Sequence, residues 1–276
     1  MNKIMKTTIP FFVGLLFLCF GCKEEPTSNP QPSATKVTTK NVKPDVTMET
    51  RLKDLTTDYC MGRFEPKNNS DFELIPIKYA DRKGMYLRKD VLAAFIQMYD
   101  AAEKDGISLQ IRSATRNFDY QKGIWERKWT GATTLSDGTN VATDINEPIA
   151  KALKILEYSS MPGTSRHHWG TDIDLNAFNN AYFESGQGKK VYSWLVQNAD
   201  KYGFCQPYTP KGKDRPHGYN EEKWHWSFNP LSREITSFAE NNLKNSMISG
   251  FKGAETAEEI DVIAKYVLGI NNRCRH

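Results

Sequence analysis

Apolar residues recur at helical spacing in four segments of the chain. Side chains three or four positions apart share one face of a helix, so each segment predicts a helix with a buried stripe. The stripes are Val91, Phe95, Tyr99 and Ala102; Ile149, Leu153 and Leu156; Val191, Leu195 and Tyr202; and Ile260, Ile263, Val267 and Ile270. We expect Asp90 to cap the first helix, Pro148 to open the second, Gly203 to close the third and Thr256 to begin a capping box before the fourth.

Alternation of apolar and polar residues predicts strands elsewhere. The alternating residues are Ile107, Leu109 and Ile111, which lead to Arg112; Asp172 to Leu175, which follow a turn; and Trp224, Trp226 and Phe228. Neighbouring side chains on a strand point to opposite faces, so one face of each strand is expected to pack on the core. Because helices and isolated strands interleave without a regular βαβ rhythm, we expect an α+β fold, in which helices flank a small, largely antiparallel sheet.

The N-terminus carries a different pattern. Lys3 and Lys6 precede an apolar run over residues 9–20, which is too short for a comfortable membrane span and has the form of a secretory signal. The run ends at Gly21-Cys22, and a small residue before a cysteine at this place resembles a bacterial lipoprotein signal. An ordinary signal peptide that contains cysteines is the alternative. We expect residues 1–21 to be the signal and a lipid on Cys22 to anchor the protein in the cell envelope, facing the periplasm or the cell exterior.

Composition divides the rest of the chain into two parts. Residues 22–49 are rich in Pro, Ser, Thr and Lys, which cannot bury a core, so this segment is expected to be a flexible tether. Residues 50–276 fit one domain, expected to be a monomer. The whole chain has 37 basic and 33 acidic side chains. The loss of Lys3 and Lys6 with the signal brings these numbers closer, so charge gives no argument for nucleic-acid binding.

Three cysteines, Cys60, Cys205 and Cys274, fall in the predicted domain. They show no C-x-x-C spacing, which argues against a cysteine zinc site. An oxidising compartment would allow one disulfide, but the sequence does not indicate which two cysteines would form it.

Histidines are concentrated in two stretches near the predicted strands. The chain has five histidines, and four of them lie between positions 167 and 225. Zinc prefers imidazole nitrogen and carboxylate oxygen, and a catalytic zinc site needs three such ligands and one open position. A further carboxylate can serve as the general base. Residues 163–175 and 221–227 supply all four groups, so they predict a catalytic zinc site.

Strand geometry narrows the choice of ligands only in part. Asp174 and His225 both lie on the polar faces of their predicted strands, so two adjacent strands would bring them to one metal ion. A histidine from the turn before Gly170 would complete the set. These arguments do not choose between His167 and His168, or between Asp172 and Asp174.

A family resemblance makes this choice. The motif Ser165-x-His167-x-x-Gly170-x-x-x-Asp174, followed by Glu222-x-Trp224-His225, resembles that of the zinc D-alanyl-D-alanine carboxypeptidases of the VanY type. Their fold is shared with the D-Ala-D-Ala dipeptidases, the lysostaphin-type endopeptidases and the hedgehog signalling domain. The resemblance covers roughly residues 109–227, and it implies that zinc is bound by His167, Asp174 and His225 and that Glu222 is the catalytic base.

The resemblance also implies which residues contact the substrate. Arg112 would lie next to the scissile bond, with Gln121 and Ser165 as further substrate-binding residues. Two features depart from the family pattern. More residues than usual separate Arg112 from Gln121, and Asp172 stands where a small apolar residue is usual.

The implied function is removal of the terminal D-alanine from peptidoglycan stem peptides, a zinc-dependent D,D-carboxypeptidase reaction. L,D-carboxypeptidase action and endopeptidase action on cell-wall cross-links use the same chemistry and remain alternatives. A non-catalytic zinc-containing binding module is a third alternative, because the hedgehog domain shares the fold; Glu222 and Arg112 argue against it.

Overall fold

The computed structural model describes residues 55–275. The predicted signal (1–21), the lipidated Cys22 and the predicted tether (22–49) lie outside the described residues. The helices are α2 (Thr57–Cys60), α3 (Lys89–Lys104), α4 (Phe118–Trp129), α5 (Val141–Asp144), α6 (Pro148–Ile155), α7 (Gly186–Asn198), α8 (Asn229–Asn242) and α9 (Ala257–Ile260). The strands are β1 (Phe72–Leu74), β2 (Tyr86–Arg88), β3 (Ile111–Ser113), β4 (Asp172–Leu175), β5 (Phe204–Cys205) and β6 (His225–Phe228).

Two antiparallel sheets organise these elements. β1 and β2 form a two-stranded sheet, and the other strands form a four-stranded sheet in the order β3-β4-β6-β5. Every pair of neighbouring strands in both sheets is antiparallel. The α+β fold with a small antiparallel sheet is therefore confirmed.

Three of the four predicted helices are confirmed. They correspond to α3, α6 and α7, with Pro148 in the first turn of α6 and Gly203 in the left-handed conformation after the turn that follows α7. The prediction of Asp90 as an N-cap is wrong, because α3 already begins at Lys89 and Asp90 lies in its first turn.

The predicted fourth helix is interrupted. α9 ends at Ile260 because Asp261 adopts a left-handed conformation, and a π-helical turn, Ile263–Val267, follows. The capping box is also wrong, since the Thr256 hydroxyl donates to the Gly253 carbonyl oxygen instead of accepting from the helix.

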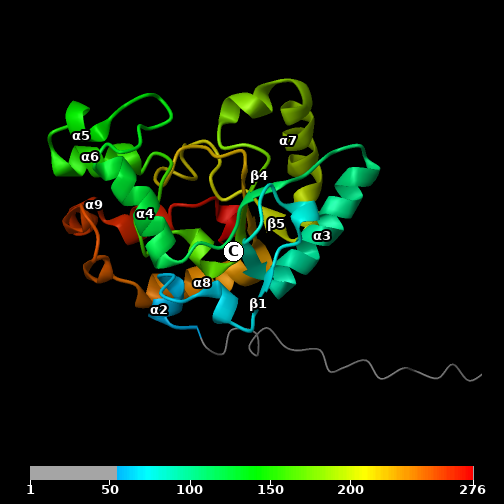
Figure 1. The fold of residues 1–276 in the computed structure, drawn as a ribbon, viewed down its shortest axis with the longest axis horizontal. Helices are drawn as coiled ribbons and strands as arrows, with labels where there is room; N and C mark the ends of the chain where they lie inside the picture. The colour runs from blue at the N-terminus through cyan, green and yellow to red at the C-terminus, as the bar shows by residue number, and fades with distance from the viewer. Residues whose placement is uncertain (1–54, 276) are drawn as a thin grey trace, which may run out of the picture. The chain divides into compact units, whose positions relative to one another are not determined.

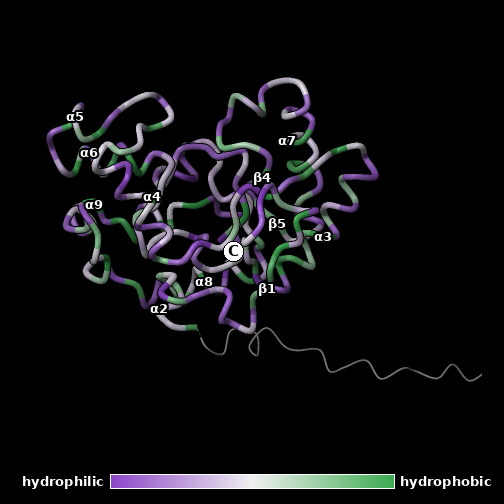
Figure 2. The backbone as a smooth tube through the Cα atoms, viewed as in Figure 1, coloured by the Kyte–Doolittle hydropathy of each residue, from purple (hydrophilic) through white to green (hydrophobic). Residues whose placement is uncertain are grey.

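Two hydrophobic clusters lie on either side of the central sheet. One joins α3 and α7 to the apolar side chains of β4 and β6, including Ile173, Leu175 and Trp226. The other joins α4, α6, α8 and α9. In Figure 1, α3 and α7 lie to one side of β4 and α4, α6 and α9 lie to the other. Figure 2 shows hydrophobic residues gathered beside α3 and β5. The polar residues of β4 and β6 therefore face away from the α3–α7 cluster.

A disulfide links β5 to the C-terminal end of the described chain. Cys205 on β5 is bonded to Cys274, and their Cα atoms are 5.7 Å apart. Cys60 is a free, buried thiol. Between residues 55 and 275, no helix has the length and apolar character that crossing a membrane requires.

Candidate functional site

The central strand pair places two of the predicted ligands opposite each other. β4 and β6 are antiparallel, with Asp174 paired to His225 and Ile173 paired to Trp226. Because side chains alternate along a strand, the apolar pair enters the core and the polar pair points to the other face. The predicted arrangement of Asp174 and His225 is confirmed.

His167 comes from a short 3-10 helix, Arg166–Trp169, just before β4. This helix ends at Gly170, which has a φ of 71°. A Cβ atom at Gly170 would lie 2.3 Å from the Phe72 ring, so only glycine fits this turn. The turn sends the chain directly into β4 and brings His167 next to Asp174.

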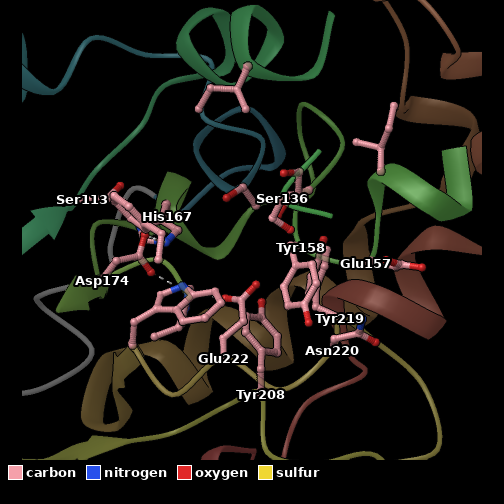
Figure 3. A pocket seen from close by; sticks show the side chains of 18 of the residues that line it. Ser113, Ser136, Glu157, Tyr158, His167, Asp174, Tyr208, Tyr219, Asn220 and Glu222 are labelled. Atoms are coloured by element: carbon pink, nitrogen blue, oxygen red, sulfur yellow. Dashed lines mark ion pairs between the residues drawn. The ribbon is translucent and has the colours of Figure 1, made fainter. Parts of the chain in front are cut away.

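His167, Asp174 and His225 form a compact, buried group. Their ligand atoms all lie within 4.8 Å of one another. Nε2 of His167 is 3.2 Å from Oδ2 of Asp174, and Nδ1 of His225 is 3.1 Å from Oδ1 of the same carboxylate. Figure 3 shows His167 and Asp174 facing each other at one side of the pocket. Oδ1 of Asp174 is buried and has no hydrogen-bond partner, as expected of an oxygen that would bind a cation.

The other nitrogen of each imidazole ring has its own acceptor. Nδ1 of His167 donates to the carbonyl oxygen of Ala114 at 2.9 Å, and Nε2 of His225 donates to Oδ1 of Asp172 at 2.9 Å. These acceptors fix the tautomers, so that the unprotonated nitrogens face Asp174. Two imidazoles and one carboxylate arranged in this way fit a zinc ion.

Asp172 also lies on β4, but it contacts the nitrogen of His225 that does not face Asp174. Its Oδ1 also accepts from Nε of Arg166 at 3.1 Å, and its Oδ2 accepts from the Thr171 hydroxyl at 2.6 Å. Arg166 is fully buried and also donates to Thr236 and Ser227. Both oxygens of Asp172 thus accept hydrogen bonds from protein groups, whereas the oxygens of Asp174 face His167 and His225.

Both ring nitrogens of His168 are likewise hydrogen-bonded to protein groups. Nδ1 lies 2.6 Å from the carbonyl oxygen of Arg116, so this nitrogen donates, and Nε2 accepts from the backbone N–H of Gly163 at 3.1 Å. Burial lowers the pKa of His168 to about 3, so the ring is neutral. His168 is therefore a structural histidine, and His167 is the one that reaches the site.

Asp174 and His167 have the charge states that bind zinc, whereas His225 must release a proton when the metal binds. Burial alone would lower the pKa of His225, but the carboxylates of Asp172, Asp174 and Glu222 outweigh it and raise that pKa. Burial alone would raise the pKa of Asp174, but the two imidazoles outweigh it and hold that pKa well below its usual range. Burial and the nearby Arg116 lower the pKa of His167. An ionised carboxylate and a neutral imidazole are the forms that bind zinc.

Glu222 lies beside this group because of a local turn. The backbone N–H of His225 donates to the carbonyl oxygen of Glu222 at 3.3 Å, which folds the segment so that both side chains lie together. Oε2 of Glu222 is 3.4 Å from Nδ1 of His225. Burial raises the pKa of Glu222, which makes its carboxylate a stronger base. Glu221 does not line the pocket.

These residues lie in a cavity of about 760 Å³. His167, Asp174, Glu222 and His225 form one part of its wall, and the cavity extends towards α4 and α6. Tyr208 packs against His225 with 4.7 Å between ring centroids, and Figure 3 shows it next to Glu222. No sequence motif indicated Tyr208.

The prediction for Arg112 is wrong in its position. Its Nε pairs with Asp81 at 2.6 Å, its Nη1 donates to the carbonyl oxygen of Asn176, and it does not line the cavity. The reason is an irregularity in β3. Ile111 pairs with Leu175 and Ser113 with the next residue, Asp174, so Arg112 is an extra residue in this strand. Ser113 lines the cavity, and the Arg112 side chain lies outside it.

Arg116 takes the place that was predicted for Arg112. Its Nη1 is 3.6 Å from Oδ2 of Asp174 and donates to the Ser113 hydroxyl at 2.9 Å, and its side chain lines the cavity. Arg116 precedes Gln121 by five residues, whereas Arg112 precedes it by nine. The unusually long separation noted in the sequence was the signal that could have identified Arg116.

Gln121 and Ser165, which were predicted to bind substrate, both line the cavity. Gln121 is held by a hydrogen bond from its Nε2 to the carbonyl oxygen of Ser160 at 2.8 Å. Its Oε1 and the Ser165 hydroxyl are buried without hydrogen-bond partners. Buried polar atoms are rarely left unpaired, so both are candidates for contacts with a substrate.

A sequence model of the VanY family, described as D-alanyl-D-alanine carboxypeptidase, matches residues 84–231. This range contains the three proposed zinc ligands, Glu222, Arg116, Gln121 and Ser165.

The chain is also similar to two curated proteins and to a protein of known structure. The Bacillus subtilis protein YodJ, a carboxypeptidase by name, is 30% identical over 174 residues, which are 59% of this chain and 54% of that protein. A D-alanyl-D-alanine carboxypeptidase of Enterococcus faecalis is 30% identical over 131 residues, 48% of this chain and 44% of that protein. The chain thus spans about half the length of these relatives. A vancomycin-resistance D,D-pentapeptidase VanY solved with Zn(II) has 24% identity and a TM-score of 0.42, covering 67% of this chain and 93% of that one.

Proposed function

Because the chain belongs to the VanY family of D-alanyl-D-alanine carboxypeptidases, we propose that it removes the terminal D-alanine from peptidoglycan stem peptides by zinc-dependent hydrolysis. The observation that carries this proposal is the convergence of His167, Asp174 and His225 with the buried carboxylate of Glu222 in one cavity. Two imidazoles, one carboxylate ligand and an adjacent base are the groups that a zinc hydrolase requires.

The proposed roles divide between metal binding and proton transfer. His167, Asp174 and His225 hold the zinc ion. Zinc in such a site supplies Lewis acidity and makes water an effective nucleophile near neutral pH. Glu222 takes a proton from the attacking water, for which its raised pKa suits it, and returns a proton to the leaving amino group.

The remaining residues of the cavity position the peptide. Arg116 is the cation next to Asp174, and in this proposal it stabilises the negative charge that develops on the scissile carbonyl oxygen. The unpaired Oε1 of Gln121 accepts a hydrogen bond from a peptide N–H. The Ser165 hydroxyl, also unpaired, hydrogen-bonds the peptide near the bond that is cleaved.

The test is incubation of the zinc-loaded protein with purified muropeptides, followed by mass spectrometry. D,D-carboxypeptidase action converts pentapeptides to tetrapeptides, and a chelator should abolish the conversion. Loss of the last residue from tetrapeptides only would assign L,D-carboxypeptidase action instead. Conversion of cross-linked dimers to monomers would assign an endopeptidase. Zinc binding without any conversion would favour a non-catalytic binding module.

We further propose that the protein acts as a monomer in the cell envelope, anchored by a lipid on Cys22 and tethered by residues 22–49. The apolar run before Gly21-Cys22 supports the anchor. The Cys205–Cys274 disulfide supports an oxidising compartment. Replacement Cys22→Ser should move the protein from the membrane fraction to the soluble fraction, and a soluble wild-type protein would contradict the anchor. Light scattering of the released protein tests the monomer.

A further inference from the structure

Lys128 stands out among the cations that line the cavity. Within residues 55–275, the other lysines and arginines of the lining each have a carboxylate partner. Arg82 pairs with Asp81, Arg116 with Asp174, Lys154 with Asp137 and Glu157, and Arg166 with Asp172. Lys128 has no such partner; its Nζ donates to the hydroxyl of Ser159.

The surroundings of Lys128 make an unpaired charge costly. Burial and the charge of Arg116 lower its pKa, and the Glu222 carboxylate acts in the opposite direction. Removing a cation from water without an anionic partner is unfavourable, so such groups commonly mark a ligand site. The missing partner should therefore be an anion that enters the cavity with a ligand.

The place of Lys128 in the fold indicates which anion this is. Lys128 lies in the last turn of α4, and Ser159 lies in the segment that leads from α6 to the buried Ser165. Together they form part of the cavity wall that also holds Gln121. Glu222, the proposed catalytic base, lines the same cavity as Lys128. In a carboxypeptidase, the free carboxylate lies only one residue beyond the bond that is cleaved, a span of about 3.5 Å.

We propose that Lys128, supported by Ser159, binds the free α-carboxylate of the terminal residue of the substrate peptide and thereby restricts the site to exopeptidase action. This inference rests on the proposed peptidase function and deepens it. An endopeptidase must accept a peptide that continues past the cleaved bond, and such a peptide presents no carboxylate at this place. The Lys128 ammonium would then lose its anionic partner.

The experiment compares two peptides that differ only at the C-terminus: a stem pentapeptide with a free carboxylate and its carboxamide. Wild-type protein should cleave the free acid with a kcat/KM about 10- to 100-fold higher, the effect expected of one charged hydrogen bond. Lys128→Met keeps the apolar stem and removes the charge, so the preference should fall towards one, through KM, with zinc content unchanged. Lys128→Arg should retain most of the preference.

Arg127 provides the matched control. It is the neighbouring cation on α4, is exposed and does not line the cavity. Arg127→Met should therefore show the wild-type preference. If Lys128→Met keeps the full preference, or if wild-type protein cleaves both peptides equally, the proposal is overturned while the peptidase function survives.

A binding measurement separates this inference from the proposed function. Calorimetry with Glu222→Gln protein should show tighter binding of the free acid than of the carboxamide, and the added change Lys128→Met should remove the difference. If this pattern is seen but wild-type protein cleaves neither peptide, the peptidase function fails and the role of Lys128 stands. Equal binding of the two peptides to Glu222→Gln protein would overturn the role of Lys128.

Discussion

Asp172 accepts a hydrogen bond from Nε2 of His225 at 2.9 Å, on the side of the ring that faces away from Asp174. The two aspartates of β4 therefore act on opposite nitrogens of one imidazole. Asp174 shares the ligand side with His167, while Asp172 fixes the ring and neutralises the buried Arg166. Strand alternation puts both aspartates on the same face, so only the direction of each carboxylate separates their roles.

Asp172→Asn should weaken zinc binding about 10- to 100-fold, the usual effect of losing the carboxylate that orients a metal-binding histidine. It should also lower the free energy of unfolding of the metal-free protein by roughly 3–5 kcal/mol, because the Arg166 charge stays buried without its partner. Zinc competition titrations and urea unfolding measure the two effects. Asp174→Asn is the comparison and should weaken zinc binding much more. If Asp172→Asn abolishes zinc binding and Asp174→Asn does not, the ligand assignment is reversed.

The adjacent histidines should respond in different ways to replacement. His168→Ala should retain zinc but lower the free energy of unfolding by roughly 2–6 kcal/mol, because it leaves the Gly163 N–H and the Arg116 carbonyl buried without partners, at about 1–3 kcal/mol for each group. His167→Ala should lose zinc binding, because it removes a ligand. Metal analysis and urea unfolding of both variants test this. Zinc binding that survives His167→Ala but not His168→Ala would refute the assignment.

Regular spacing explains why much of the fold could be predicted. The buried stripes of α3, α6 and α7 repeat at helical spacing, and the apolar residues of β4 and β6 alternate, so the paired positions of Asp174 and His225 could be anticipated. α4 was not predicted. Its buried positions include the polar Gln121, and its other cavity-lining residues are not a continuous apolar stripe. A helix that faces a polar cavity does not carry the amphipathic pattern on which such predictions rest.

Periodicity could not place Arg116, and only its spacing of five residues to Gln121 could have identified it. It lies between β3 and α4, and no periodicity controls the direction of a side chain in such a connection. Arg112 has a strand position, but the register of β3 shifts between Ile111 and Ser113, and the apolar pattern does not reveal such an irregularity. In the structure Ser113 lines the cavity and Arg112 does not.

The two arginines give a test of this correction. Arg116→Met should lower turnover by about 10²–10³, the range seen when one group that stabilises the developing oxyanion is removed. Arg112→Met should leave turnover within a few-fold of wild type, because its guanidinium pairs with Asp81 outside the cavity. Steady-state kinetics on a stem pentapeptide measure both. A large loss in Arg112→Met with an active Arg116→Met would restore the original assignment.

The Cys205–Cys274 disulfide should contribute to the stability of the domain. The two cysteines are 69 positions apart, so the bond closes a long loop in the unfolded chain. Chain entropy alone predicts a loss of about 4 kcal/mol in unfolding free energy for the double replacement by serine, and native-state adjustment can reduce it. Urea unfolding with and without a reductant measures the effect. Cys60→Ala is the control: its unfolding should remain equally sensitive to the reductant, because the disulfide is intact. An unfolding midpoint that does not respond to the reductant in either protein would contradict the prediction.

Replacement of Glu222 separates the proposed base from the metal ligands. Glu222→Gln keeps the shape of the side chain and removes its basicity, so zinc content and folding should survive. Turnover should fall by about 10²–10⁴, the usual contribution of a general base. Steady-state kinetics and metal analysis on the same preparation measure both.

Glu221 is the matched control because it is adjacent and equally acidic but does not line the cavity. Oε2 of Glu222 lies 3.4 Å from Nδ1 of His225, whereas the Glu221 side chain is outside the cavity lining. Glu221→Gln should therefore change turnover far less. Loss of activity in Glu221→Gln alone would mean that the base is the neighbouring carboxylate. Full activity in both variants with zinc bound would mean that neither carboxylate takes the proton, and the mechanism would then need a different base within the same cavity.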